Sequence, residues 1–71
     1  MSELLGRRLR ALRRLKRLTQ QDLAREVGIS VSLLSTIERG MKYPQLDLIK
    51  RFARVLDVPL EELFVLPESV Q

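Results

Sequence analysis

The sequence has 71 residues, which is enough for one small domain with a single core and too few for two. Hydrophobic residues make up 45% and charged residues 31%, a balance typical of a globular domain and not of a disordered tail. Cysteine and histidine are both absent, which excludes disulfides, thiolate or imidazole zinc sites and catalysis with a histidine base. We therefore expect no metal, no cofactor and no catalytic residues, and no small-molecule ligand is evident.

The formal net charge is +4, and the positive residues are concentrated near the N-terminus. No acidic residue stands between Glu3 and Asp22, a segment that holds Arg7, Arg8, Arg10, Arg13, Arg14, Lys16 and Arg17. Because surface Lys and Arg neutralise phosphates and release counterions, this segment favours a polyanionic partner. A solvated helix face, a membrane-binding amphipathic helix and a transit peptide remain alternatives for it.

No apolar run approaches the roughly 18 residues that a membrane-spanning helix needs. The N-terminus also lacks the apolar segment and cleavage site of a signal peptide. We therefore expect a cytoplasmic protein without a membrane partner.

The predicted elements are all helices, because glycines and prolines separate intervals of helical length and no segment alternates apolar with polar residues. The first helix is expected at residues 2–16. Its apolar residues recur at steps of three and four and share one face: Leu5, Leu9, Leu12 and Leu15. Most of the arginines fall on the opposite face, but Arg13 lies at the margin of the apolar one.

Two short helices with a tight turn between them are expected next, at residues 20–27 and 31–39. Thr19 and Ser30 can accept hydrogen bonds from the first backbone N–H groups of these helices. Gly28 follows the last apolar residue of the first of them, where a left-handed residue ends many helices. A fourth and a fifth helix are predicted at residues 46–56 and 60–66. Residues 1–66 then form the domain, and residues 67–71 are a short C-terminal tail.

Residues 20–39 combine a small residue, a turn residue and apolar anchors at fixed spacing. Two helices that cross at roughly 90–120° over a short turn need all three. Ala24 is the small residue at the crossing and Gly28 is the turn residue. The main apolar anchors are Leu23, Val27, Ile29, Leu34 and Ile37. This pattern indicates a helix-turn-helix.

The sequence resembles the phage repressor and Cro-like regulators, the Xre type of helix-turn-helix protein. The resemblance covers nearly the whole chain and includes Leu5-Gly6-Arg7-Arg8-Leu9, Leu18-Thr19-Gln20, Leu23-Ala24, Gly28-Ile29-Ser30, Ile37-Glu38-Arg39-Gly40 and Leu56-Asp57-Val58-Pro59. It implies an all-α, five-helix, lambda-repressor-like DNA-binding domain whose helix-turn-helix consists of helices two and three. The implied function is a sequence-specific transcriptional regulator, expected to be a repressor, at the nucleoid of a prokaryotic or phage system.

The resemblance also implies which residues touch DNA, with the third helix in the major groove. The base-facing candidates are Val31, Ser32, Ser35 and Thr36, with Leu33 marginal. The phosphate-contact candidates are Gln20, Thr19, Arg13, Arg39, Lys42 and Tyr43. Valine and hydroxyl side chains are compatible with several bases, so the operator sequence is not predicted. The arginine-rich first helix is expected to supply long-range attraction more than direct contacts.

The family register brings Arg13 and Glu38 together as a salt bridge that fixes the third helix. Arg17 and Gln45 depart from the usual residues at the helix ends, which are therefore expected to be weaker than is typical.

The family also implies a homodimer on a palindromic operator. Phe64, Val65 and Leu66 are the candidate interface, although closing the core is an equally good role for them.

A protein-interaction module, such as an antitoxin-like binder with the same fold, is the alternative function. A binder of this kind that does not recognise DNA should show little affinity for random duplex even at low salt. An enzyme has no support, since Glu61 and Glu62 are adjacent and would not face each other on a helix.

Overall fold

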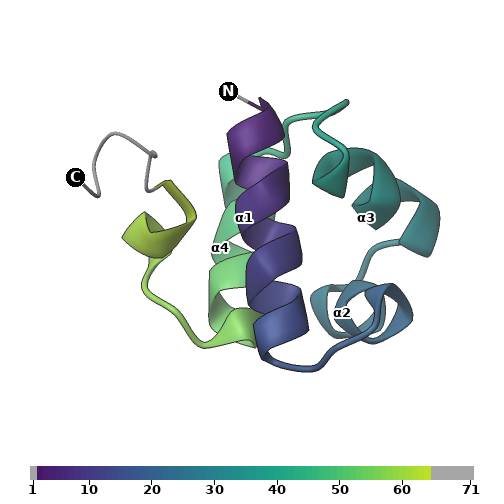
Figure 1. The fold of residues 1–71 in the computed structure, drawn as a ribbon, viewed down its shortest axis with the longest axis horizontal. Helices are drawn as coiled ribbons and strands as arrows, with labels where there is room; N and C mark the ends of the chain where they lie inside the picture. Colours follow the sequence, from purple (N-terminus) through teal and green to yellow (C-terminus); the bar gives the residue numbers. More distant parts are fainter. Residues whose placement is uncertain (1, 65–71) are drawn as a thin grey trace.

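The computed structural model describes residues 2–64, and Figure 1 shows how their helices pack. The elements are α1 (Ser2–Leu15), α2 (Gln20–Val27), α3 (Val31–Glu38), α4 (Leu46–Leu56) and the short 3-10 helix η1 (Leu60–Phe64). The all-α prediction is confirmed, and the described part contains no strand. No helix within it is long and apolar enough to cross a membrane.

The fifth predicted helix differs from the expectation, because it is a single 3-10 segment. Its predicted end at residue 66, and with it Val65, Leu66 and the tail at residues 67–71, lies outside the described residues. The third helix is one residue shorter than expected, since Arg39 follows its last residue as the cap.

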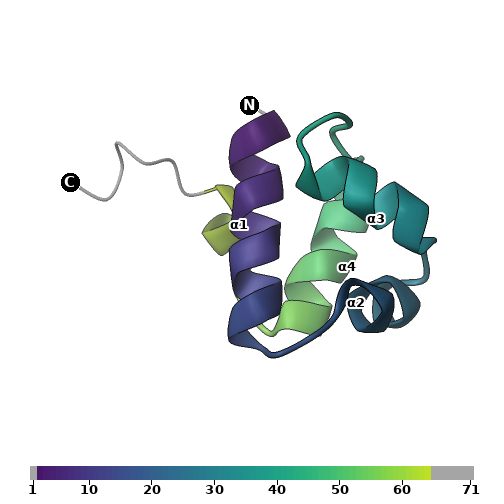
Figure 2. The same ribbon diagram turned by 45° about the vertical axis from the view of Figure 1, so that its right-hand side comes forward.

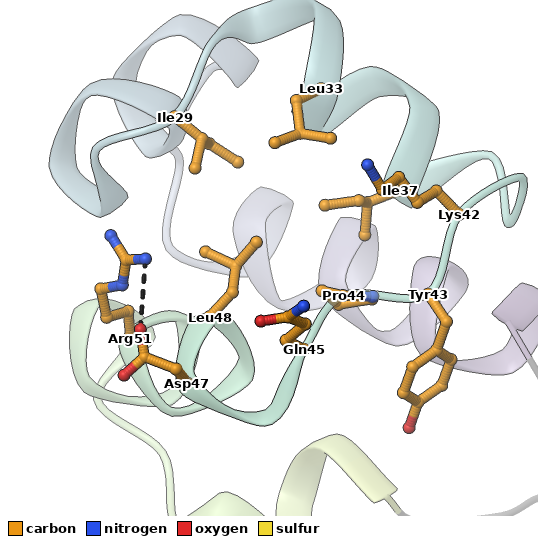
Figure 3. A pocket seen from close by; sticks show the side chains of 10 residues that line it. All are labelled: Ile29, Leu33, Ile37, Lys42, Tyr43, Pro44, Gln45, Asp47, Leu48 and Arg51. Atoms are coloured by element: carbon orange, nitrogen blue, oxygen red, sulfur yellow. Dashed lines mark hydrogen bonds and ion pairs between the residues drawn. The ribbon is translucent and has the colours of Figure 1, made fainter.

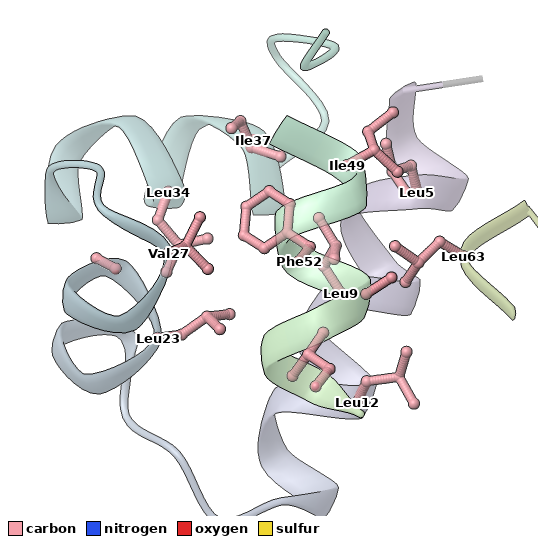
Figure 4. Close-up of a cluster of buried hydrophobic side chains, with 13 residues drawn as sticks. Leu5, Leu9, Leu12, Leu23, Val27, Leu34, Ile37, Ile49, Phe52 and Leu63 are labelled. Carbon is pink, nitrogen blue, oxygen red and sulfur yellow. The ribbon is translucent and has the colours of Figure 1, made fainter. Parts of the chain in front are cut away.

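One hydrophobic core joins all the elements (Figures 2 and 4). Phe52 of α4 is fully buried at its centre, with side chains of α2 and α3 on one side and of α1 on the other. Burying each such side chain contributes roughly 1.5–3 kcal/mol. The core residues are Leu5, Leu9, Leu12, Leu23, Ala24, Val27, Leu34, Ile37, Ile49, Phe52, Ala53, Leu56 and Leu63.

Leu15 is a correction to the predicted core, because its side chain is 73% exposed. The repeat of leucines shows which face a residue occupies but not where the neighbouring helices end. α1 ends at Leu15, and the chain turns back through Arg17, whose φ is 61°. Leu18, beyond that turn, packs against the core.

All four α-helices are followed by a left-handed residue: Arg17, Gly28, Gly40 and Asp57. In each turn the N–H of the next residue donates to a carbonyl five residues earlier, as Leu18 does to Arg13 at 3.0 Å. This is the Schellman arrangement, which satisfies carbonyls that have no partner within the helix. Gly28 has the conformation that its position in the sequence predicts.

The helix starts follow the capping pattern of the sequence. Thr19 Oγ1 accepts a hydrogen bond from the N–H of Asp22, and Asp22 in turn accepts from the N–H of Thr19, both at 3.0 Å. Ser30 Oγ accepts from the N–H of Leu33 at 3.0 Å. Gln45, expected to be a poor cap, makes no side-chain cap bond at the start of α4.

Gly6 allows α1 and α3 to touch. A Cβ at this position would lie 2.6 Å from the carbonyl oxygens of both Ile37 and Glu38. Real Cβ atoms do not approach backbone that closely, so any larger residue would push the end of α3 away from α1. Gly6 therefore positions the helix that the sequence assigns to the major groove.

Candidate nucleic-acid interface

The four base-facing candidates lie on the outer side of α3. Val31 is 39% exposed, Ser32 is exposed, and Ser35 and Thr36 are half-buried. Leu33, the marginal candidate, instead packs against the core. The outer side of α3 therefore consists of small side chains, over which the helix backbone can closely approach another molecule.

The hydroxyl of Thr36 has a partner inside its own helix. Its Oγ1 donates to the carbonyl of Ser32 at 2.9 Å. The Thr36 side chain therefore offers hydrogen-bond acceptance and a methyl group to a ligand, while its proton is used internally.

The carboxylate of Glu38 ties three helices together. Arg13 donates to it from Nε at 2.7 Å and from Nη2 at 3.2 Å, and Gln20 Nε2 donates at 3.0 Å. Glu38 has no exposed side-chain surface, and Arg13 has 10%. The structure thus brings together the predicted Arg13–Glu38 pair and adds Gln20, which the sequence did not link to them. The start of α2 is held at a fixed place relative to α3.

Arg13 has little freedom to reach outwards. Besides its two bonds to Glu38, it donates from Nη1 to the carbonyl of Leu18 at 2.9 Å. All three of its nitrogens are engaged within the protein, so the guanidinium helps to close the turn after α1 as well as to orient Glu38.

Arg10 lies beside Glu38, although the helical spacing predicts it on the solvent face of the first helix. Its Nε lies 3.7 Å from Glu38 Oε1, and its side chain is 41% exposed. The available signal was its spacing, since residues three apart are neighbours on a helix and Arg13 was already assigned to this carboxylate.

The remaining phosphate candidates lie at the end of α3 and in the turn after it. Arg39, Lys42 and Tyr43 are all exposed, and Arg39 Nε donates to the carbonyl of Ser35 at 3.3 Å. Lys42 and Tyr43 border a groove of about 360 Å³, across which Leu33 and Leu48 point toward one another (Figure 3). The phosphate candidates therefore form two groups, one around Glu38 and one around this turn.

The N-terminus of α2 carries the capping box of Thr19 and Asp22. Hydrogen bonds from the backbone and hydroxyl of Thr19 lower the pKa of the Asp22 carboxyl, and Arg25, 3.0 Å away, lowers it further. Thr19 is exposed beside the half-buried Gln20. Free N–H groups in the first turn of a helix attract anions, so this end suits a phosphate.

Residues 4–64 match the helix-turn-helix domain family. The chain belongs to this family. It is 47% identical over 62 residues to the uncharacterized HTH-type transcriptional regulator YazB of Bacillus subtilis, with 87% of this chain and 90% of that protein covered.

Two solved structures share the fold of this helix-turn-helix domain. One is the restriction-modification controller protein C.AhdI from Aeromonas hydrophila, with a TM-score of 0.85, 38% identity and 89% and 96% of the two chains covered. The other is the hypothetical transcription factor NHTF from Neisseria, with a TM-score of 0.90, 28% identity and 97% and 79% covered. The Xre-type, Cro-like family and the class of DNA-binding transcriptional regulator are thereby confirmed.

Three further residues hold the elements of this domain together, a role that no sequence pattern assigned to them. Gly6 could have been noticed as a glycine inside a helical pattern, which often marks a close contact. Arg51 donates from Nη1 to the carbonyl of Val27 at 3.0 Å and so fastens the end of α2 to α4. Arg8 donates from Nε to the carbonyl of Glu62 at 2.9 Å and pairs with its carboxylate, which holds η1 against α1. The two arginines make pairings over long sequence separations, which no local pattern indicates.

Proposed function

We propose that this domain represses transcription by binding a specific duplex site with α3 in the major groove. The observation that carries the proposal is the outer side of α3, where only small side chains stand between the helix and a partner. Hydrogen-bonding and cationic groups flank that side at Gln20, at Arg39 and at Lys42. Base edges would face the small residues and backbone phosphates the flanking groups, as in other helix-turn-helix complexes.

In this proposal the bases are contacted by four residues of α3: Val31, Ser32, Ser35 and Thr36. The methyl groups of Val31 suit a thymine methyl. Thr36, whose proton is already donated to Ser32, would accept from an exocyclic amino group of adenine or cytosine. These contacts give sequence preference without the long bidentate side chains that other members of the family use.

Phosphate contacts set the register of the helix on the duplex. Gln20 donates one amide hydrogen to Glu38, and its other amide hydrogen would donate to a phosphate at the start of α2, next to Thr19. The second group, Arg39, Lys42 and Tyr43, would hold a phosphate on the far side of the groove. Arg13 contributes mainly by orienting Glu38, with its remaining N–H hydrogens directed to the same phosphate as Gln20.

A homodimer on a palindromic operator completes the proposal, because one α3 contacts too few base pairs for useful specificity. Half-sites in this family lie roughly 34–36 Å apart, about one turn of DNA. The proposed interface begins at Phe64, which is 42% exposed at the end of η1. Binding to chromosomal DNA would place the protein at the nucleoid, in the cytoplasm.

Selection of binding sites from random duplex DNA tests this function. The affinities of the unmodified protein and of two variants are then measured on the selected duplex and on a random duplex. We expect the double variant Ser32→Ala and Thr36→Ala to lose discrimination between the two duplexes. Gln20→Ala should weaken both by similar factors. Equal losses from the double variant would remove these residues from base readout, and a site-selective loss would add Gln20 to it.

Two results would overturn the broader proposal. Absence of duplex binding even at low salt would contradict DNA recognition and favour the antitoxin-like alternative. Increased transcription in vitro from a promoter that carries the selected site would contradict repression.

A further inference from the structure

A second hollow lies between the N-terminal half of α1 and the end of α3. Its volume is about 280 Å³, and its lining residues are Glu3, Arg7, Arg10, Glu38 and Arg39. Figures 1 and 2 both show the first turns of α1 beside the end of α3. Gly6 lets the two segments approach closely here, because its position leaves no room for a Cβ beside the carbonyls of Ile37 and Glu38.

The charges around this hollow are predominantly positive. Glu38 is already balanced by its buried pair with Arg13 at 2.7 Å. Three guanidinium groups then face one remaining carboxylate, that of Glu3. Guanidinium groups bind phosphate oxygens in a forked, charge-assisted geometry, so this hollow suits a phosphate group.

The three arginines can turn toward a ligand without breaking a hydrogen bond to another helix. Arg7 is exposed and takes part in no hydrogen bond or ion pair among residues 2–64. Arg10 lies 3.7 Å from Glu38, beyond hydrogen-bond distance, and Arg39 makes only a 3.3 Å bond to a carbonyl of its own helix. Binding an anion here would therefore require little internal rearrangement.

The hollow adjoins the surface that the proposed function assigns to DNA. Arg10 and Gln20 both approach the same oxygen of Glu38, at 3.7 Å and 3.0 Å. Arg39, the cap residue of α3, follows Ser35 by one helical turn. A DNA strand whose phosphate lies at Gln20 would therefore pass close to Arg10 and Arg7.

We propose that this hollow binds an additional backbone phosphate, so that α1 contacts the DNA directly through Arg7 and Arg10. This inference rests on the proposed function, and it extends the footprint along α1 beyond Arg13. It also revises the expectation that the arginine-rich helix supplies long-range attraction more than direct contacts. Free pyrophosphate shares the chemistry of the site, and the test separates the two sources.

The test measures the affinity for a random-sequence duplex as a function of salt concentration. A duplex of about 24 base pairs is long enough to cover the proposed footprint. Each phosphate contact that is lost lowers the slope of log K against log salt by about 1. We expect this loss for Arg7→Gln and again for Arg10→Gln. Between about 50 and 200 mM salt, the advantage of the unmodified protein over Arg7→Gln should shrink about fourfold.

Arg54→Gln is the matched control, because Arg54 is an exposed arginine in the last turn of α4 and its replacement removes the same charge. Its slope should stay at the unmodified value. Glu3→Gln should strengthen binding, since it removes the only unpaired carboxylate of the hollow. Equal slopes for Arg7→Gln and Arg54→Gln would overturn the site while leaving DNA binding intact. A protein that binds no duplex at all would overturn the proposed function as well.

Titration of inorganic pyrophosphate, followed by the NMR signals of the arginine side chains, tests the other source. We expect no saturable shift of the Arg7 signal at millimolar pyrophosphate. A saturable shift combined with an unchanged DNA slope for Arg7→Gln would overturn the DNA assignment in favour of a free phosphate ligand.

Discussion

At the scale of single residues, the buried carboxylate of Glu38 connects the parts of the interface. It accepts hydrogen bonds from α1 and from the start of α2, while it belongs to α3. A buried charge that loses its partner is strongly destabilising, whereas an exposed pair contributes little. The same carboxylate therefore stabilises the fold and sets the orientation of Gln20 toward DNA.

Replacing Glu38 with Gln should lower the free energy of unfolding by about 3–5 kcal/mol, because Arg13 is left as an uncompensated buried charge. Asp47→Asn is the control, since Asp47 pairs with Arg51 at 3.4 Å on the surface and its loss should cost no more than about 1 kcal/mol. Urea unfolding measures both. A double-mutant cycle of Glu38→Gln with Arg13→Met should show strong coupling, and additive losses would contradict the pairing argument.

Asp22 makes the stability of α2 depend on pH. The hydrogen bonds from Thr19 lower the pKa of this carboxyl in the folded state from its ordinary value of 3.8. Its contribution to stability is therefore complete above that value and is lost as the pH falls through the lower folded pKa. The stability difference between the unmodified protein and Asp22→Asn should shrink as the pH decreases from 6 to 2, about the range over which carboxylates titrate. A difference that stays constant over this range would contradict the ionised capping box.

At the scale of elements, the helix ends show where the sequence departs from its favoured residues. Gly28 and Gly40 adopt positive φ without a Cβ penalty, whereas Arg17 and Asp57 adopt it at 61° and 58° despite having one. Left-handed conformations cost an ordinary residue roughly 1–2 kcal/mol, although Asp tolerates them better than Arg. The turn after α1 is thus the most strained of the four, in agreement with the departure of Arg17 from the family pattern.

Arg17→Gly should stabilise the domain by about 1 kcal/mol, because glycine occupies the left-handed region without strain. Arg14→Gly is the matched control, since it makes the same replacement at an exposed helical position and should cost about 1 kcal/mol. Thermal unfolding at low salt and at high salt separates backbone strain from the removal of positive charge. If the two variants destabilise the domain equally, the turn after α1 carries no strain.

At the scale of the whole molecule, the sequence predicted most of the fold through its local patterns. Leu5, Leu9 and Leu12 are buried as their spacing requires, and the capping residues begin their helices where expected. The prediction that Leu15 is buried was wrong, because periodicity does not reveal where a neighbouring helix ends. The family register brought Arg13 to Glu38, but the third partner, Gln20, depends on how closely the start of α2 approaches the end of α3. Such a distance follows from tertiary packing, so no local pattern contains it.

The proposed assembly of two copies depends on the surface at the end of η1, where Phe64 is exposed. η1 is fixed against α1 by the buried Leu63 and by the pairing of Arg8 with Glu62, so Phe64 projects from a defined place. If it forms the dimer contact, Phe64→Asp should raise the dimer dissociation constant at least about tenfold, because a charge buried in an apolar contact costs more than 1.4 kcal/mol. Leu15→Asp, at another exposed apolar residue, should leave assembly unchanged. Sedimentation equilibrium measures the dimer dissociation constants of both variants, and circular dichroism verifies that they are folded. Equal dissociation constants would exclude Phe64 from the interface.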